Sequence, residues 1–203
     1  MEALVIGKPN VGKSLFTINF AAYLGAKQIP GPLSQSQGSL RKRSILSIDE
    51  ARRRLVSPKS YRTLVPCRME INLGQGREKK TLWLIDTTGI QEGVHHQAEI
   101  RAAMATTLAW LSKVDLVIHL VDATTLGSKR PAAIGAVDDE IYHYARGHGP
   151  YLLLANKTDK PGAQDNLPYL REHFAGISVI AVSALTGRGF REIKTLTLQY
   201  LNA

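Results

Sequence analysis

The sequence predicts an α/β fold of three layers, in which a mostly parallel six-stranded sheet carries helices on both faces. The first observation behind this prediction is that short apolar runs alternate with stretches of helical periodicity along the chain. The second is that two β-rich runs flank residues 74–77, a Gly-Gln-Gly-Arg turn, and therefore form a hairpin with one antiparallel strand. With 203 residues, the chain is expected to form a single domain over residues 1–203.

The elements follow one another in a regular order. The predicted strands are residues 3–6, 64–73, 81–85, 116–121, 151–155 and 178–182. Apolar side chains recur three and four positions apart in the predicted helices, at residues 15–24, 100–111, 137–144, 167–174 and 190–201. The runs at 116–121 and 151–155 are apolar throughout, which is typical of buried parallel strands. Ligand sites in such sheets lie beyond the carboxyl ends of the strands.

Residues 26–60 interrupt this alternation. Pro30, Gly31 and Pro32, followed by a Ser- and Gln-rich run, predict a flexible loop that buries little apolar surface. Within it, Ser47 and Glu50 form a capping box, which predicts a short helix over residues 48–56. The apolar face of that helix is expected to consist of Ile48, Ala51 and Leu55.

The net charge of +9 is concentrated in the same part of the chain. Residues 27–62 hold nine basic and two acidic side chains, so this stretch alone carries +7. A concentrated basic stretch indicates nucleic acid, an acidic protein or an anionic membrane surface as a partner. The alternative is an ordinary solvated helix face, from which Arg53 and Arg54 point into water.

Composition and cysteine content indicate the compartment. The longest apolar runs are far shorter than a transmembrane helix, so no transmembrane segment is expected. A single cysteine, Cys67, excludes an intramolecular disulfide framework and fits a reducing compartment. Met1 lies six residues before Gly7, which leaves no room for a signal peptide. We therefore expect a cytoplasmic protein.

The clearest functional motif is GKPNVGKS at residues 7–14, between the first strand and the first helix. In that setting G-x-x-x-x-G-K-S is a phosphate-binding P-loop, and it predicts a P-loop nucleoside triphosphatase fold. Backbone N–H groups wrap the phosphates, Lys13 supplies a positive charge, and the Ser14 hydroxyl is placed to ligate Mg²⁺. The residues expected to bind the nucleotide here are Gly7, Asn10, Val11, Gly12, Lys13, Ser14 and Leu15.

Three further motifs follow in a fixed order at strand ends: DTTG at residues 86–89, NKTD at 156–159 and SAL at 183–185. Together with the P-loop they resemble the translation-factor-like class of P-loop GTPases, most closely its Era/MnmE-like branch, as a stand-alone G domain. The resemblance spans the whole chain. It implies a Mg²⁺-dependent molecular switch that hydrolyses GTP to GDP and phosphate, slowly unless an ion or partner activates it.

The NKTD motif separates guanine from adenine. Guanine presents adjacent N1–H and N2–H₂ donors, which the carboxylate of Asp159 can accept together, whereas adenine would leave that carboxylate unpaired. The resemblance implies that Asn156 holds this loop against the P-loop, that the Lys157 stem stacks along the base, and that the Ala184 N–H donates to guanine O6. The residues expected at the base are Asn156, Lys157, Asp159, Ser183, Ala184 and Leu185.

The resemblance also assigns the metal and switch residues. Asp86 matches the Mg²⁺-linked aspartate, and Gly89 matches the glycine whose N–H senses the γ-phosphate. Thr63 is our choice for the switch I threonine that closes over Mg²⁺, because it immediately precedes a β-rich run; Thr81, inside the hairpin, is less suitable. Residues 26–60 are then an insertion in switch I. The expected metal ligands are Ser14, Thr63 and Asp86.

Two departures from the family pattern concern catalysis. Thr88 replaces the usual proline, whose side chain the chemistry does not need. Ile90 stands where Ras-like enzymes carry a catalytic glutamine, and it cannot orient a water. In this branch the P-loop asparagine can coordinate a K⁺ that takes the place of an arginine finger, so Asn10 and K⁺ are candidates; a turn residue is the alternative. The expected catalytic residues are Asn10, Lys13, Thr63 and Gly89.

Two functions stay open at this point. In the first, hydrolysis controls docking to RNA or a ribosomal particle through residues 26–60. In the second, the same segment docks to a protein or an anionic membrane, and hydrolysis is only a timer. A nucleotide-dependent homodimer is a further candidate state.

Overall fold

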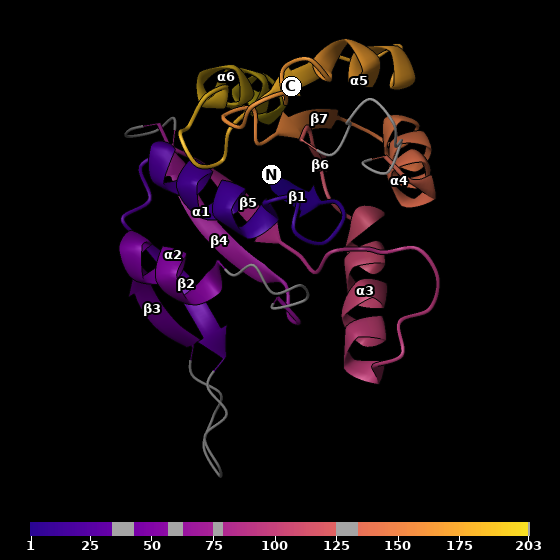
Figure 1. Cartoon of the computed structure of the whole chain (residues 1–203). Coiled ribbons are helices and arrows are strands. Elements are labelled where there is room, and N and C mark those ends of the chain that lie inside the picture. Colours follow the sequence, from indigo (N-terminus) through magenta and orange to yellow (C-terminus); the bar gives the residue numbers. More distant parts are fainter. Residues whose placement is uncertain (34–42, 57–62, 75–78, 125–133, 203) are drawn as a thin grey trace.

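The computed structural model describes residues 1–33, 43–56, 63–74, 79–124 and 134–202. Within them, a six-stranded sheet has the order β4-β5-β1-β6-β7-β8 (Figure 1). β4 runs antiparallel to β5, and the other neighbouring pairs are parallel. The strands are β1 (Glu2–Ile6), β4 (Cys67–Leu73), β5 (Lys80–Asp86), β6 (Leu116–Asp122), β7 (Tyr151–Asn156) and β8 (Val179–Ala181). The predicted fold class is confirmed.

The helices cover both faces of this sheet because successive residues of each strand point to opposite faces. Ala3 and Val5 of β1 belong to the core beneath α1 (Lys13–Tyr23) and α6 (Phe190–Asn202). Leu4 and Ile6 belong to the core on the other face, beneath α3 (Ala98–Leu111) and α4 (Ala136–Arg146). α5 (Leu167–His173) packs with α4 against β7. None of the described helices is both long enough and apolar enough to cross a membrane.

The strand predicted from residue 64 begins later, at Cys67. The register pairs Cys67 with Asp86, the last residue of β5, so residues before Cys67 have no partner on that strand. Leu64 and Val65 are accordingly exposed, by 43% and 57%. Thr63, Leu64 and Val65 therefore belong to a connecting segment rather than to the sheet.

The flexible loop predicted over residues 26–60 is wrong for part of that segment. β2 (Gln28–Leu33) and β3 (Arg43–Ser47) form an antiparallel pair with an irregular register between Pro30 and Leu33. Ile29 and Leu46 are each only 2% exposed and join the core on the α1 side of the sheet. These two apolar side chains provide the burial that the polar composition seemed to exclude. The predictions for residues 34–42 and 57–60 lie outside the described part of the chain.

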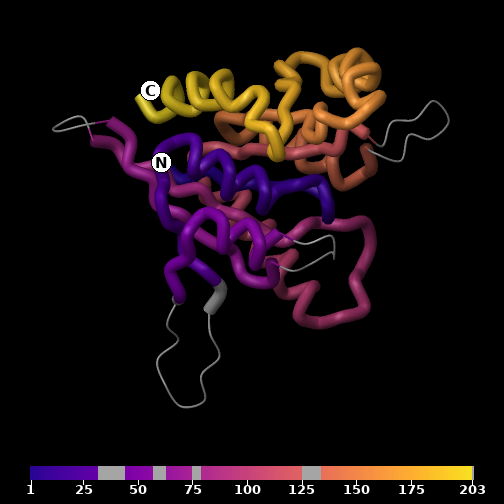
Figure 2. The backbone as a smooth tube through the Cα atoms, turned by 60° about the vertical axis from the view of Figure 1, so that its left-hand side comes forward, coloured from indigo at the N-terminus to yellow at the C-terminus, as the bar shows by residue number. Residues whose placement is uncertain are grey.

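The short helix predicted within the segment is present as α2 (Ile48–Leu55). The Ser47 hydroxyl accepts from the Glu50 N–H at 3.3 Å, and the Glu50 carboxylate accepts from the Ser47 N–H at 3.4 Å. Ala51 is fully buried in the core, and Ile48 and Leu55 pack against it. β2, β3 and α2 therefore form one unit beside α1 (Figures 1 and 2).

Candidate functional site

The P-loop connects the carboxyl end of β1 to the start of α1. Gly12 has φ +100°, and a Cβ at this position would lie 2.4 Å from Asn156 Nδ2, so a side chain would be strained and would clash. Lys13 is 6% exposed, and its ammonium group donates to the Lys8 carbonyl at 2.7 Å. Val11 is buried, and Leu15 packs partly buried against the core. The loop is therefore closed on itself by the bond from Lys13 to Lys8, and Asn156 packs directly against Gly12.

The buried position of Lys13 changes its protonation. Burial lowers the pKa of Lys13 to about 8, although the nearby charges of Asp86 and Asp138 act to raise it. A buried ammonium group with few hydrogen-bond acceptors gains more than an exposed one when an anion arrives. The positive charge of Lys13 is therefore only partly balanced by the protein, which favours the binding of a phosphate.

The three predicted metal ligands come together beneath the P-loop. The Ser14 hydroxyl donates to Asp86 Oδ2 at 2.7 Å, and the Thr63 hydroxyl lies 3.4 Å from the same oxygen. Ser14 Oγ and Thr63 Oγ1 are 3.3 Å apart. Thr63 reaches this position although residues 57–62, which precede it, are outside the described part of the chain.

Asp86 has the properties expected of a cation ligand. Its Oδ1 is buried and has no hydrogen-bond partner among the described residues. Burial raises the pKa of Asp86, while the hydroxyl groups of Ser14 and Thr63 and the charge of Lys13 act to lower it. A carboxylate with an unpaired oxygen and two hydroxyl groups are hard oxygen donors of the kind that suits Mg²⁺. Within the described residues, no cluster of three or more His, Cys, Asp or Glu side chains forms another metal site.

The residues that follow Asp86 contact both Thr63 and the P-loop. The Thr88 hydroxyl donates to the backbone carbonyl of Thr63, a contact that the usual proline could not make. A Cβ on Gly89 would lie 2.6 Å from the Pro9 nitrogen, so this backbone lies directly against the P-loop. Ile90 is 6% exposed and packs in the core beside α3, so its side chain does not reach toward the loop.

The motifs at the ends of β7 and β8 are joined to the P-loop through Asn156, which is 1% exposed. Its Nδ2 donates to the Val11 carbonyl at 2.8 Å, and its Oδ1 accepts from the Ala184 N–H at 2.8 Å. The Ser183 hydroxyl donates to Asp159 Oδ1 at 2.6 Å and so orients that carboxylate. The donation of the Ala184 N–H to guanine O6 stays a prediction.

Asp122 is a site residue that sequence reasoning missed. It ends β6, and its carboxylate pairs with the ammonium group of Lys157, whose backbone has φ +68°. Asp122 Oδ1 also accepts from the Thr124 N–H at 2.9 Å. The available signal was its place, because Asp86 and Asn156 likewise end strands of the same sheet. Asp122 holds the head of Lys157 while the stem stays available for an apolar contact.

A second missed group lies under the first residues of the P-loop. Lys8 Nζ is 3.1 Å from Asp138 Oδ2, and Asp138 Oδ1 is 3.1 Å from His119 Nε2. His119 Nδ1 is in turn 2.7 Å from the Tyr151 hydroxyl. Asp138 is fully buried, although acidic side chains are rarely buried without partners. Burial acts to raise the pKa of Asp138, but His119 and Lys8 together hold it below its usual value.

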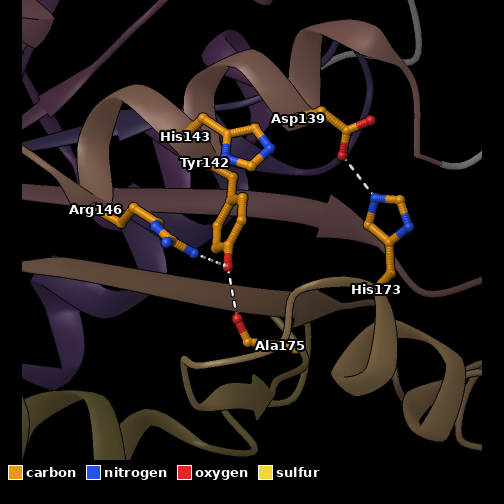
Figure 3. A pocket seen from close by; sticks show the side chains of 6 residues that line it. All are labelled: Asp139, Tyr142, His143, Arg146, His173 and Ala175. Atoms are coloured by element: carbon orange, nitrogen blue, oxygen red, sulfur yellow. Dashed lines mark hydrogen bonds and ion pairs between the residues drawn. The ribbon is translucent and has the colours of Figure 1, made fainter.

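A cavity of about 370 Å³ lies between α4 and α5, and none of the motif residues line it (Figure 3). Its polar side chains already pair with one another: His173 Nε2 is 2.6 Å from Asp139 Oδ1, and Arg146 donates to the Tyr142 hydroxyl at 2.6 Å. That hydroxyl donates to the Ala175 carbonyl at 2.6 Å. The candidate site is therefore the P-loop end of the sheet.

The lowered pKa of Lys13 predicts how stability depends on pH. Unfolded, the lysine keeps its proton up to its ordinary value of 10.5, whereas the folded protein loses it above about 8. The unfolded state therefore binds more protons between these values, and stability rises with pH through this window. The free energy of unfolding of the wild type minus that of Lys13→Met should increase by up to about 3 kcal/mol from pH 7 to pH 10.

Urea denaturation without nucleotide measures this difference at each pH. Lys160→Met, which removes an exposed lysine, is the matched control and should give a difference that hardly changes. A difference that is equally flat for Lys13→Met would contradict the lowered pKa of Lys13.

Comparisons with known proteins identify the family of this chain. Residues 40–157, more than half of the chain, match the family described as 50S ribosome-binding GTPase. The chain is 31% identical over 164 residues to the GTPase Obg of Desulforudis audaxviator, and 30% identical over 159 residues to that of Alkaliphilus oremlandii. These matches cover 79% and 75% of this chain but only 37% and 35% of the two relatives, so the chain spans little more than a third of their length.

Solved structures share the fold at lower identity. A structure of Era in complex with MgGDPNP and nucleotides 1506–1542 of 16S ribosomal RNA has a TM-score of 0.67 at 22% identity, covering 98% of this chain and 56% of Era. A probable GTP-binding protein EngB has a TM-score of 0.58 at 18% identity, covering 100% of this chain and 99% of that one. The family model matches more than half of the chain, and the P-loop, the cluster of Ser14, Thr63 and Asp86 and the Asn156 bridge are all present. The chain therefore belongs to the 50S ribosome-binding GTPase family.

Proposed function

We propose that this chain binds GTP and GDP together with Mg²⁺, hydrolyses GTP to GDP and phosphate, and acts as a molecular switch. The observation that carries the proposal is the bridge from the P-loop to the base loops through Asn156. It supports the proposal because it links the P-loop to the loop after β8, in which Ser183 holds the Asp159 carboxylate. Family membership and the relatives named Obg support the same activity. The single cysteine supports a cytoplasmic location.

Each residue of the site has a role in this proposal. Ser14, Thr63 and Asp86 would hold Mg²⁺, which neutralises charge on the phosphates when bound. Lys13 would balance charge on the β- and γ-phosphates, and the Gly89 N–H would sense the γ-phosphate, a role supported by the close approach of Gly89 to Pro9 in the P-loop. Ile90 packs in the core, so no side chain at that position orients the attacking water.

The hydrogen bond from Thr88 to Thr63 has a consequence for switching. It ties switch I to the DTTG motif through a side chain and a backbone carbonyl. Thr63 is therefore near its metal-binding position through contacts of the protein itself. Part of the ordering that a γ-phosphate would otherwise have to supply is already present.

Base selectivity tests the proposed function most directly. The wild type should bind GDP far more tightly than ADP, since guanine offers the Asp159 carboxylate two adjacent N–H donors and adenine does not. Asp159→Asn should shift the preference toward xanthine nucleotides, whose 2-carbonyl needs a donor. Competition against a fluorescent guanine nucleotide measures both effects, and Asp165→Asn, an exposed carboxylate nearby, is the control. Equal affinity of the wild type for ADP and GDP would refute guanine binding.

We propose that K⁺ assists hydrolysis through Asn10. This side chain is exposed at the P-loop and its backbone has φ +63°, a conformation that asparagine tolerates. Replacing Na⁺ by K⁺ should accelerate turnover in the wild type, and Asn10→Ala should remove the difference while retaining GDP binding. Phosphate release at constant ionic strength measures the rates. If the wild type hydrolyses GTP equally fast in both salts, Asn10 has only a turn role.

We propose RNA, in a ribosomal context, as the partner of the basic insertion. The complex of Era with 16S ribosomal RNA and the charge of +7 over residues 27–62 support it. The structure also separates the three arginines of α2. Arg54 pairs with Glu50 at 3.5 Å and Arg52 with Asn19 at 2.8 Å, whereas Arg53 is exposed and makes no hydrogen bond or ion pair with the described residues. Arg53 is thus the arginine most available to a phosphate.

The salt dependence of RNA binding tests this assignment. Arg53→Gln should weaken binding to ribosomal RNA and reduce the slope of log affinity against log salt by about one, since one phosphate contact is lost. Glu70→Gln, an exposed change on β4, is the control for altered net charge. Binding to anionic vesicles or to a protein without RNA would favour the docking alternative instead. A nucleotide-dependent homodimer stays a prediction, which analytical ultracentrifugation in the presence of GTP and of GDP would test.

A further inference from the structure

Asn19 connects the insertion to the loop that is expected to read guanine. Asn19 lies on α1 and is half-buried, and its Nδ2 donates to the Ala184 carbonyl at 2.6 Å. On its other side, Asn19 Oδ1 accepts from Arg52 Nε at 2.8 Å. Arg52 belongs to α2, so three separate segments of the chain meet at one amide group.

The two bonds of Asn19 depend on each other. An amide has donors on its nitrogen and an acceptor on its oxygen, so the Arg52 N–H selects the rotamer in which the nitrogen faces Ala184. With the carbonyl held by Asn19 and the N–H held by Asn156, both polar groups of Ala184 have side-chain partners. Ala184 is 2% exposed, so a backbone carbonyl released there would lose its partner in a site with little water.

Arg52 is itself held in place from two directions. Its Nη1 donates to Asp49 Oδ1 at 2.9 Å, one turn back on α2. α2 is held against α1 by Ala51, which is fully buried next to it in the chain. The contact with Asp49 is an exposed ion pair and contributes little by itself. The bond to Asn19 is different, because it connects α2 to a backbone group beside the base loop.

We infer that Asn19 and Arg52 are positioning residues for guanine recognition, through which the docked insertion tightens the hold on the base. The inference rests on the proposed function, because it takes Ala184 as the residue that faces guanine O6. Arg52 acts on Asn19, and Asn19 fixes the carbonyl of Ala184. That carbonyl and the Ala184 N–H are attached to the same Cα, so fixing the carbonyl limits the orientation of the N–H, which donates to Asn156 here and which the proposal directs to guanine O6. A partner that draws α2 away from α1 would also remove Arg52 and so accelerate nucleotide release.

Release of a fluorescent GDP from the full chain tests the inference. Arg52→Gln should speed release about ten-fold, the effect expected when a charged donor is lost. Arg53→Gln, the adjacent change on the same helix with the same loss of charge, should leave release unchanged. Thermal unfolding of both variants, saturated with nucleotide, shows whether they remain equally folded.

Substitutions of Asn19 separate the two bonds. Asn19→Asp keeps a partner for Arg52 but cannot donate to the Ala184 carbonyl, so it should speed release as much as Asn19→Ala. In either background, Arg52→Gln should add little, because the path to Ala184 is already broken. The variants should also lose more affinity for GDP than for 6-thio-GDP, in which the sulfur is a weaker acceptor than O6. A purely structural defect would affect both nucleotides alike.

The possible results distinguish a failure of the proposed function from a failure of the inference about Asn19 and Arg52. If the wild type fails to prefer guanine nucleotides, the proposed function is wrong. If the wild type binds GDP but Arg52→Gln and Arg53→Gln release it at the same rate, the function stands and the inference is wrong. Rapid release from Asn19→Ala with wild-type release from Asn19→Asp would also overturn it, because the Ala184 bond would then be unimportant.

Discussion

The site depends on the two hydrogen bonds of Asn156. One side-chain amide binds the Val11 carbonyl in the P-loop and the Ala184 N–H after β8. Asn156 is almost fully buried, so water cannot satisfy these polar groups in place of the two hydrogen bonds. Losing either bond would leave a buried polar group unpaired. The close approach of Gly12 to the same amide shows how little space is left between these segments. The relative position of the phosphate and base loops follows from this bridge.

Buried charge is the second constraint on this end of the sheet. Lys13 and Asp86 are both buried, and burial lowers the pKa of one and raises the pKa of the other. Their mutual attraction only partly offsets the loss of hydration. Asp86 also keeps one oxygen without a partner among the described residues. A site of this kind costs stability until an anion and a cation arrive together, and a nucleotide with its metal ion supplies both.

The described part of the insertion is folded and packs against the rest of the domain. β2, β3 and α2 contribute Ile29, Leu46 and Ala51 to the core on the α1 side of the sheet. Its basic side chains therefore differ in availability, although they are neighbours in the sequence. All three arginines of α2 are exposed, but Arg52 donates to Asn19 and Arg54 is paired with Glu50, whereas Arg53 makes no hydrogen bond or ion pair with the described residues. A basic run on a docked helix can thus serve the domain and a partner at once.

The sequence alone determined the fold class, the strand and helix order, and the motifs at the strand ends. Hydrophobic periodicity and short motifs depend only on neighbouring residues, so they can be read along the chain. The tertiary structure alone decided the burial of Ile29 and Leu46, the inward turn of Asp138, and the pairing of Lys157 with Asp122. Each of these depends on segments far apart in the sequence, whose register and orientation are set by packing. Local composition carries no information about such contacts, which is why the insertion looked like a loop.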